Sequence, residues 1–290
     1  MPKISELPAG TPTLAGIVPV VENGVTKRVP ISSLKALVGA YDNAGAHNAL
    51  YRGKDLTAYF SSGDMSAAIA NGTFADIYPG DYVTKSITVG GTTYNVKWVV
   101  AGINTLLYTD NALKSNHVVM VPEGIIGKAV MNDTNTTEGG YAGSKMFTET
   151  IPLYAAAITA AFGASHVVKH SVLLSQSVNN ALDSMCGMGN RGAAVDNWNT
   201  WTEVTCNLMN EMMVYGSLIW TSGAGEARSC PIQLPAFRHD PSLMWAKNNN
   251  FWLSSVARSG VFAFVGGVVG GANNGGASYS YGVRPYFLLK

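Results

Sequence analysis

The stretch that decides the fold is residues 251–290, FWLSSVARSGVFAFVGGVVGGANNGGASYSYGVRPYFLLK. Short apolar runs alternate here with pieces rich in Gly, Ser and Asn, a pattern typical of β-hairpins joined by tight loops. In the last piece, Val283, Pro285 and Phe287 fall on one face of a strand by alternation. Because Pro285 has no N–H to donate, we expect it at an edge or a bulge-like point of a sheet.

The same stretch mixes two kinds of position. Apolar and aromatic side chains between Trp252 and Gly282 are interleaved with Gly, Ala and Ser, which provides contact area at little entropic cost, as in antibody loops. Strand alternation buries about half of such residues. Phe264, between Ala263 and Val265, could equally fill the core. We expect the structural positions to be Trp252, Leu253, Val283, Pro285 and Phe287.

Upstream of this stretch, residues 57–250 contain both helix and strand signals. A capped helix is predicted from Asp64, and residues 81–103 predict a hairpin whose second arm alternates apolar and polar positions. HVVMVPE predicts a short buried strand, and IPLYAAAITAAFGA predicts a helix that ends at Gly163. LMNEMMVYG is expected to pack inside, and NDTNTTEGG at 132–140 is expected to be a polar loop. Together with the C-terminal hairpins, these signals predict an α+β domain over residues 57–290.

Residues 1–40 read as a separate unit. IVPVV, an Asn-Gly turn and VTKRVPI predict a hairpin, and Ser32 is expected to cap a short helix, SSLKALV. Forty residues bury little of their own surface, so the unit should need a partner. Residues 41–56 are polar with Gly and Ala, which indicates either a linker or a surface loop of a single domain.

The composition excludes several classes of protein. The 290 residues carry 19 Lys and Arg against 18 Asp and Glu, so the net charge of +1 does not provide the basic surface that nucleic acid requires. No stretch reaches the roughly 18 apolar residues of a membrane span, and the start lacks the apolar core of a signal peptide. We therefore expect synthesis in a cytoplasm, with lysis as a route of release. Cys186, Cys206 and Cys230 are expected to be reduced thiols.

Several short motifs are candidates for chemical sites. Gly187–Gly192 matches GxGxxG, but no apolar strand precedes it, so a loop is favoured over a dinucleotide site. His166 and His170 lack the Glu that follows the first His in zinc hydrolases. Oxygen ligands over Asn132–Thr136 could suit calcium, yet an Asx-turn loop fits better because the later bidentate Glu is missing. We therefore expect no metal, no cofactor and no catalytic residue.

Two regions resemble known phage proteins. KISELP followed by VPVVENGVTKRVPISSL resembles the N-terminal piece of many bacteriophage tail-fibre and receptor-binding proteins, which commonly joins a distal domain to the tail. Residues 57–290 resemble phage C-type-lectin-like receptor-binding domains through FADIYPGDYV, TTYNVKW, HVVMVPE, MNDTNTTEGGYAGSKM, LMNEMMVYGS and the frame FWL…GVRPYF. These domains include the variable proteins of diversity-generating retroelements, such as the major tropism determinant.

The resemblance implies a fold and a function. It implies a C-type-lectin-like domain over 57–290, preceded by a tail or baseplate attachment unit at 1–40 and a linker at 41–56. In the family, the segment between the Trp and the GVRP element, here about 252–282, is variable while the frame holds the fold. The calcium-binding motifs of animal C-type lectins are absent from this sequence, so calcium-dependent sugar binding is not implied.

The leading hypothesis is therefore a virion adhesin, made in the host cytoplasm, that is not an enzyme. Its expected partners are a bacterial cell-surface receptor (protein or glycan), other tail or baseplate proteins and two further copies in a homotrimer, with no nucleic acid and no membrane insertion. The alternatives are a tail-associated hydrolase, which would need two of Glu203, Glu211, Glu226, Asp133 and Asp196 in one open groove, and a purely structural tail protein. The candidate receptor-binding residues are Arg258, Val261, Phe264, Val268, Val269, Asn273, Asn274, Tyr279 and Tyr281.

Overall fold

A computed structural model describes residues 17–22, 25–30, 43–107, 113–175, 201–221 and 228–290. The chain divides into two compact units, residues 1–43 and residues 44–290. In the first unit, β1 (Ile17–Glu22) and β2 (Val25–Pro30) pair in antiparallel fashion with Glu22 opposite Val25. This confirms the predicted hairpin, whereas the helix predicted at 32–38 lies outside the described residues.

The second unit is mixed α+β, as predicted, and is built on a largely antiparallel sheet in the order β10-β15-β5-β4-β3. β3 (Tyr82–Val89) and β4 (Thr92–Ile103) form the predicted hairpin, and β5 (Val118–Pro122) is the predicted HVVMVPE strand. β15 (Pro285–Leu289) is an inner strand, flanked on one side by β5 and on the other by β10 (Cys206–Leu208) and β7 (Val167–Val168). Pro285 is its first residue and pairs with Leu208 of β10 but not with β5, a strand-start position that tolerates the missing N–H of proline.

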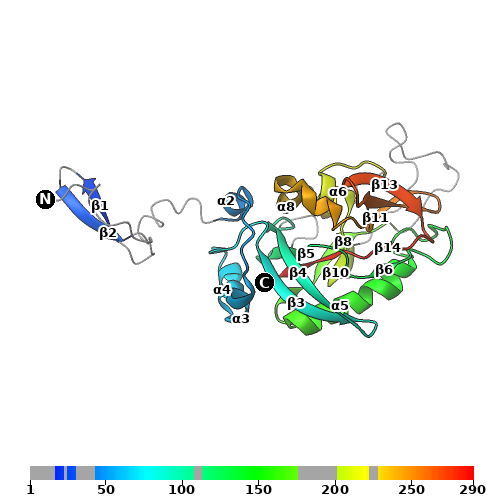
Figure 1. Ribbon diagram of the computed structural model, residues 1–290, viewed down its shortest axis with the longest axis horizontal. Coiled ribbons are helices and arrows are strands. Elements are labelled where there is room, and N and C mark those ends of the chain that lie inside the picture. Colours follow the sequence, from blue (N-terminus) through cyan, green and yellow to red (C-terminus); the bar gives the residue numbers. More distant parts are fainter. Residues whose placement is uncertain (1–16, 23–24, 31–42, 108–112, 176–200, 222–227) are drawn as a thin grey trace. The chain divides into compact units, whose positions relative to one another are not determined.

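Alternation along these strands produces two apolar faces. Trp98, Met120 and Phe287 face one side, which is covered by α5 (Ile151–Phe162) and by α3 (Thr57–Ser61) and α4 (Asp64–Ala70). Val99 and Leu288 face the other side, which packs on α6 (Glu211–Tyr215) and α8 (Pro235–His239). Figure 1 shows α5 and the pair α6 and α8 on opposite sides of the sheet. The predicted helices at 64 and 151 are confirmed, the second ending at Gly163 with φ +89°.

A second sheet carries the C-terminal stretch in the order β13-β12-β11-β14-β6. β11 (Phe251–Arg258), β12 (Val261–Gly266) and β13 (Gly271–Gly276) form an antiparallel meander, and β14 (Tyr281–Gly282) runs parallel to β11 beside β6 (Lys128–Ala129). The expected structural residues are buried: Trp252, Leu253, Val283, Pro285 and Phe287. The remaining elements are a single π turn at Met146–Thr150, a 3₁₀ helix named η5 (Pro241–Trp245), and a two-stranded sheet of β8 (His170–Leu173) with β9 (Trp201–Val204).

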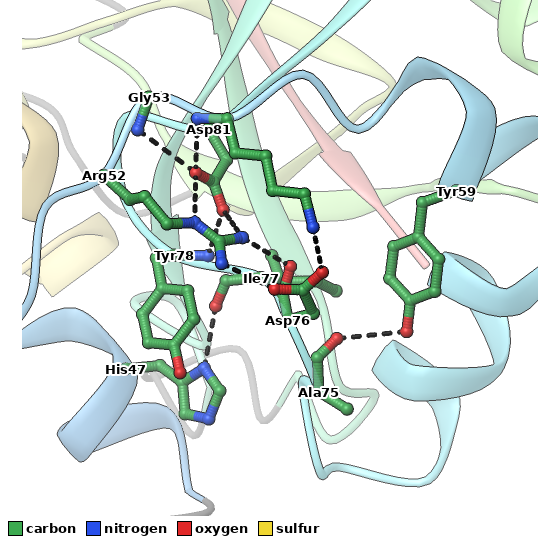
Figure 2. Close-up of polar contacts among 10 residues, drawn as sticks. His47, Arg52, Gly53, Tyr59, Ala75, Asp76, Ile77, Tyr78 and Asp81 are labelled. Atoms are coloured by element: carbon green, nitrogen blue, oxygen red, sulfur yellow. Dashed lines mark hydrogen bonds and ion pairs between the residues drawn. The ribbon is translucent and has the colours of Figure 1, made fainter. Parts of the chain in front are cut away.

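The expected linker at 41–56 is wrong for its described part. Residues 44–56 belong to the second unit, beginning with α2 (Ala44–Asn48) and ending at Leu56, which is fully buried. One cause is the carboxylate of Asp81, fully buried, which accepts hydrogen bonds from the Arg52 guanidinium and from the backbone N–H groups of Gly53 and Lys54 (Figure 2). A polar segment is thus held in place partly by a buried carboxylate and partly by contacts such as those of Asn48 with the backbone of Ile103, which hydropathy alone does not reveal.

Candidate functional site

Among the described residues, the most exposed large hydrophobic side chains lie at the turn between β12 and β13. Val268 is 78% exposed and Val269 is 75% exposed. Two hydrogen bonds fix the backbone of the turn. The N–H of Gly267 donates to Asn250 Oδ1 at 2.8 Å, and Tyr215 Oη donates to the carbonyl of Gly270 at 3.2 Å. A Cβ on Gly267 would lie 2.3 Å from the backbone carbon of Asn249. The two valines are therefore presented to solvent on a fixed backbone.

The structure separates the nine candidate residues into three groups. Val268, Val269, Asn273 and Tyr279 are exposed, with Tyr279 at 52%. Half-buried positions are Arg258, Val261, Asn274 and Tyr281. Phe264 is buried at 5% exposure, so its assignment to the binding surface is corrected here.

Phe264 is buried because it belongs to an aromatic cluster beneath the surface. Its ring centroid lies 4.4 Å from that of Tyr281, and Tyr281 lies 4.7 Å from Trp252. Trp252 Nε1 in turn donates to the carbonyl of Ala129 at 3.0 Å. Tyr279, at 6.1 Å from Tyr281, forms the exposed end of the row. The exposed Tyr279 ring therefore packs against the Tyr281 end of this buried cluster.

The polar loop at 132–140 supports the same surface from the side. Asn135 Oδ1 accepts from the N–H and hydroxyl of Ser278, at 3.0 and 2.8 Å. Within the loop, Asn132 donates to the carbonyl of Thr136 and accepts from the N–H of Lys145, while Asp133 pairs with the Lys145 ammonium. These contacts agree with the favoured hydrogen-bonded loop. Among the described residues, no three His, Cys, Asp or Glu side chains gather as metal ligands.

The carboxylates that a hydrolase would need have other partners where they are described. Glu211 is fully buried and accepts from the backbone N–H groups of residues 219–221 at 3.0–3.1 Å. Glu203 is exposed on β9 and pairs with Lys169. Asp196 and Glu226, like the GxGxxG motif, lie outside the described residues.

The two histidines at 166 and 170 do not share a helix face. His170 lies on β8, buried, with Nε2 2.9 Å from Tyr286 Oη, whereas His166 precedes β7 beside Ser66. Burial raises the pKa of Cys206 and Cys230, which are both unpaired thiols as expected; Cys186 lies outside the described residues.

One exposed residue near this surface was not a sequence candidate. Trp245 is 46% exposed at the end of η5, and a Cβ on Gly270 would lie 3.1 Å from its ring. The residue stands in an irregular stretch with scattered tryptophans, and no periodicity distinguishes it from a core tryptophan. Only the 3₁₀ helix, begun by Asp240 accepting from the Ser242 N–H, turns the ring outward.

Within the described parts of the chain, no helix combines the length and apolar character that crossing a membrane requires. Comparison with protein-family models, curated proteins and solved structures finds no match to this chain.

Proposed function

We propose that this chain is a bacteriophage receptor-binding protein whose second unit is a C-type-lectin-like domain of the kind found in the variable proteins of diversity-generating retroelements. The first unit attaches to the tail or baseplate. The second unit binds a bacterial surface receptor through the segment 252–282. The mechanism is recognition, in which no bond is made or broken.

The observation that carries the proposal is that this one segment combines buried residues at its ends with exposed residues between them. The frame residues at both ends of the segment are buried, while Val268, Val269 and Tyr279 stand exposed between them. Adjacent apolar side chains that stand exposed on a rigidly held, glycine-rich turn are typical of an interaction surface. A purely structural tail protein would cover these side chains once assembled, and the experiment below separates the two roles.

The proposal includes assembly into a trimer. The described part of the first unit is a two-stranded hairpin with exposed residues Pro19, Thr26, Lys27 and Arg28, and a hairpin by itself is marginal in water. Contact with further copies would stabilise it. Several copies would also convert a modest affinity per site into firm attachment through avidity.

The test is the binding of fluorescently labelled full-length chain to a panel of intact Gram-negative and Gram-positive bacteria. The variant Val268→Ser with Val269→Ser and Tyr279→Ser removes the exposed apolar contacts. The matched control is Leu153→Ser, which removes a side chain of 54% exposure from α5, an element outside the segment. We expect selective binding to some strains, reduced by about tenfold or more in the triple variant and unchanged in the control.

Two outcomes contradict the proposal. The first is that the chain binds none of the strains. The second is that the triple variant binds the recognised strains as well as the parent chain does, which would favour the structural role.

A further inference from the structure

A groove outside the C-terminal segment has the features of a ligand site. Its volume is about 410 Å³. It is lined by Tyr51 and Gly80, by Lys97 and Val99 of β4, by Glu123 directly after β5, and by side chains from the stretch 240–248. Nothing in the proposed receptor role of segment 252–282 requires this groove.

Two partly exposed aromatic side chains line the groove. Tyr51 is 40% exposed and Trp245 is 46% exposed. The Tyr51 ring lies flat against Gly80, where a Cβ would come within 2.6 Å of the ring, and Tyr51 Oη donates to Asp240 Oδ2 at 2.9 Å. The first ring is therefore fixed from both its face and its hydroxyl end. Half-exposed aromatic rings offer an apolar face with a polar edge, the surface to which the C–H face of a sugar ring binds.

The charges in the groove are balanced. Glu123 is held between two ammonium groups, with Oε1 2.9 Å from Lys97 Nζ and Oε2 2.5 Å from Lys247 Nζ. Asp240 accepts from Tyr51 and from the N–H and hydroxyl of Ser242. Two cations and two anions leave no net charge, so the groove favours neither an anionic nor a cationic ligand. It does provide closely spaced hydrogen-bond donors and acceptors, which suits a neutral polyhydroxylated ligand.

The wall that carries Trp245 has an unusual backbone. Ala246, Lys247 and Asn248 have φ values of +41°, +57° and +65°, three consecutive residues other than glycine in the left-handed region. Such conformations are strained and persist where the surrounding structure over-determines them, often at ligand sites. The side-chain amide of Asn249 donates to the carbonyls of Ala246 and Lys247 and holds the turn closed.

The groove continues beyond the Lys247–Glu123 ion pair. A second hollow of about 440 Å³ on the other side of this pair shares Lys97, Glu123 and Lys247 as lining residues. The two hollows are therefore neighbours that share the ion-paired side chains of Glu123 and its two lysines. Two neighbouring hollows of this kind suit a linear chain of several units better than a compact ligand.

We propose that this groove, with Tyr51 and Trp245 as its aromatic walls and Lys97, Glu123, Lys247 and Asp240 as its polar contacts, binds a neutral oligosaccharide. Sugar rings pack on the two aromatic side chains. Their hydroxyl groups replace water at the ion pairs.

The test uses the full-length chain on an array of neutral, acidic and amino-sugar oligosaccharides, followed by calorimetric titration of the strongest neutral binder. We expect at least one neutral oligosaccharide to bind, and more tightly than its constituent monosaccharide. Trp245→Ala should weaken that binding about tenfold or more. Leu153→Ala, which trims an exposed apolar side chain elsewhere, should leave it unchanged.

Three outcomes overturn the proposal: no neutral oligosaccharide binds, only charged oligosaccharides bind, or Trp245→Ala binds as the parent does. If Trp245→Ala does not fold, Trp245→Phe replaces it, and this variant should show a smaller loss of oligosaccharide affinity. In the parent chain, the added oligosaccharide must also slow hydrogen exchange over residues 240–249. The Val268, Val269 and Tyr279 triple variant must retain oligosaccharide binding. Loss of binding in that variant would place the sugar on segment 252–282, refuting the groove while leaving the receptor role standing.

Discussion

The guanidinium of Arg284 donates to the carbonyl oxygen of Leu243 at 2.7 Å, although the two residues lie 41 positions apart. The same side chain donates to the carbonyls of Pro122 and Glu123, at 2.9 and 3.1 Å, and lies fully buried against the rings of Phe237 and Phe251. Burial lowers its pKa, because the cation has backbone carbonyls rather than a carboxylate as direct partners. Arg284 thus ties the GVRPYF strand to the wall that carries Trp245.

We expect Arg284→Lys to destabilise the second unit by about 3 kcal/mol. A lysine cannot span the carbonyls of both Pro122 and Leu243, so buried acceptors lose their partners. Urea unfolding followed by circular dichroism measures the loss. The control is Arg258→Lys at a half-buried position, where the change should stay within about 0.5 kcal/mol. Equal effects of the two substitutions would show that Arg284 is not a structural tie.

Glu211 and Glu203, both candidate carboxylates of the hydrolase alternative, differ in burial and therefore form a matched pair for a stability test. Glu211→Gln turns an amide N–H₂ toward backbone N–H groups of residues 219–221, and we expect a loss of about 2 kcal/mol in the free energy of unfolding. Glu203→Gln removes only an exposed pair with Lys169, for which the expected change is below about 1 kcal/mol. Chemical denaturation of both variants checks the order, and a larger loss at Glu203 would contradict it.

Stability should fall on mild acidification because of two buried histidines. Burial lowers the pKa of His117 to about 4 and that of His170 to about 3, from 6.5. His117 Nε2 already accepts from the N–H of Leu106, so a second proton there would oppose a donor. Below pH 6.5 these histidines bind protons in the unfolded chain but not in the folded chain. Their neutral forms therefore contribute fully to the free energy of unfolding above pH 6.5, and this contribution declines as the pH falls. By pH 5 the loss is about 2 kcal/mol from each histidine.

Urea unfolding between pH 5 and pH 7.5 measures this dependence. The window avoids carboxylates such as Asp76 and Glu123, whose lowered pKa values place their contribution below it. In His170→Gln the slope against pH should be about half that of the parent, because one of the two titrating groups is gone. An unchanged slope would show that His170 does not cause the acid loss.

The two tyrosines of the C-terminal segment should behave differently. Tyr281→Ala removes a ring packed on Trp252 and Phe264, and we expect a loss of about 2 kcal/mol in the free energy of unfolding. Tyr279→Ala removes an exposed ring and should cost less than about 0.5 kcal/mol. Thermal unfolding of the two single variants separates the roles. Comparable melting temperatures would mean that Tyr281 is not part of the core.

The full-length chain should be a homotrimer. Multi-angle light scattering at micromolar concentration gives the mass directly, and removal of residues 1–43 should weaken or abolish the association. The matched control is the same measurement on the Leu153→Ser variant, which leaves the hairpin intact. A monomeric parent chain would contradict the assembly and with it the avidity argument.

Much of the architecture could be predicted from local patterns. The β3–β4 hairpin, β5 and α5 follow from apolar period and from Gly163 at the helix end, since these signals depend only on neighbours in sequence. The attachment of residues 44–56 could not, because it depends on Asp81, a polar residue whose burial is compensated by long-range donors. Hydropathy reads such a segment as solvent-exposed.

The candidate receptor-binding surface could be predicted only in part from the sequence, because long-range pairing decides which of its residues are exposed. Glycine-rich composition marks the segment, and Val268, Val269 and Tyr279 are exposed within it. Alternation alone could not place Phe264, since either register of β12 would suit VFAFV until its pairing with β11 and β13 was known. Trp245 gave no signal, because its exposure depends on one 3₁₀ turn and on Gly270 in a distant hairpin.

The tight backbone contacts of two glycines limit how this segment can vary in evolution or in a designed library. A side chain at Gly267 would meet the backbone of Asn249 at 2.3 Å, and one at Gly282 would meet Ile125 at 2.2 Å. Replacing either glycine by a residue with a side chain would therefore disfavour folding before binding could be selected. Substitutions that preserve the fold would therefore be found mainly at exposed positions between the two glycines, such as Val268, Val269, Asn273 and Tyr279. The number of useful variants would then depend on packing rather than on the length of the segment.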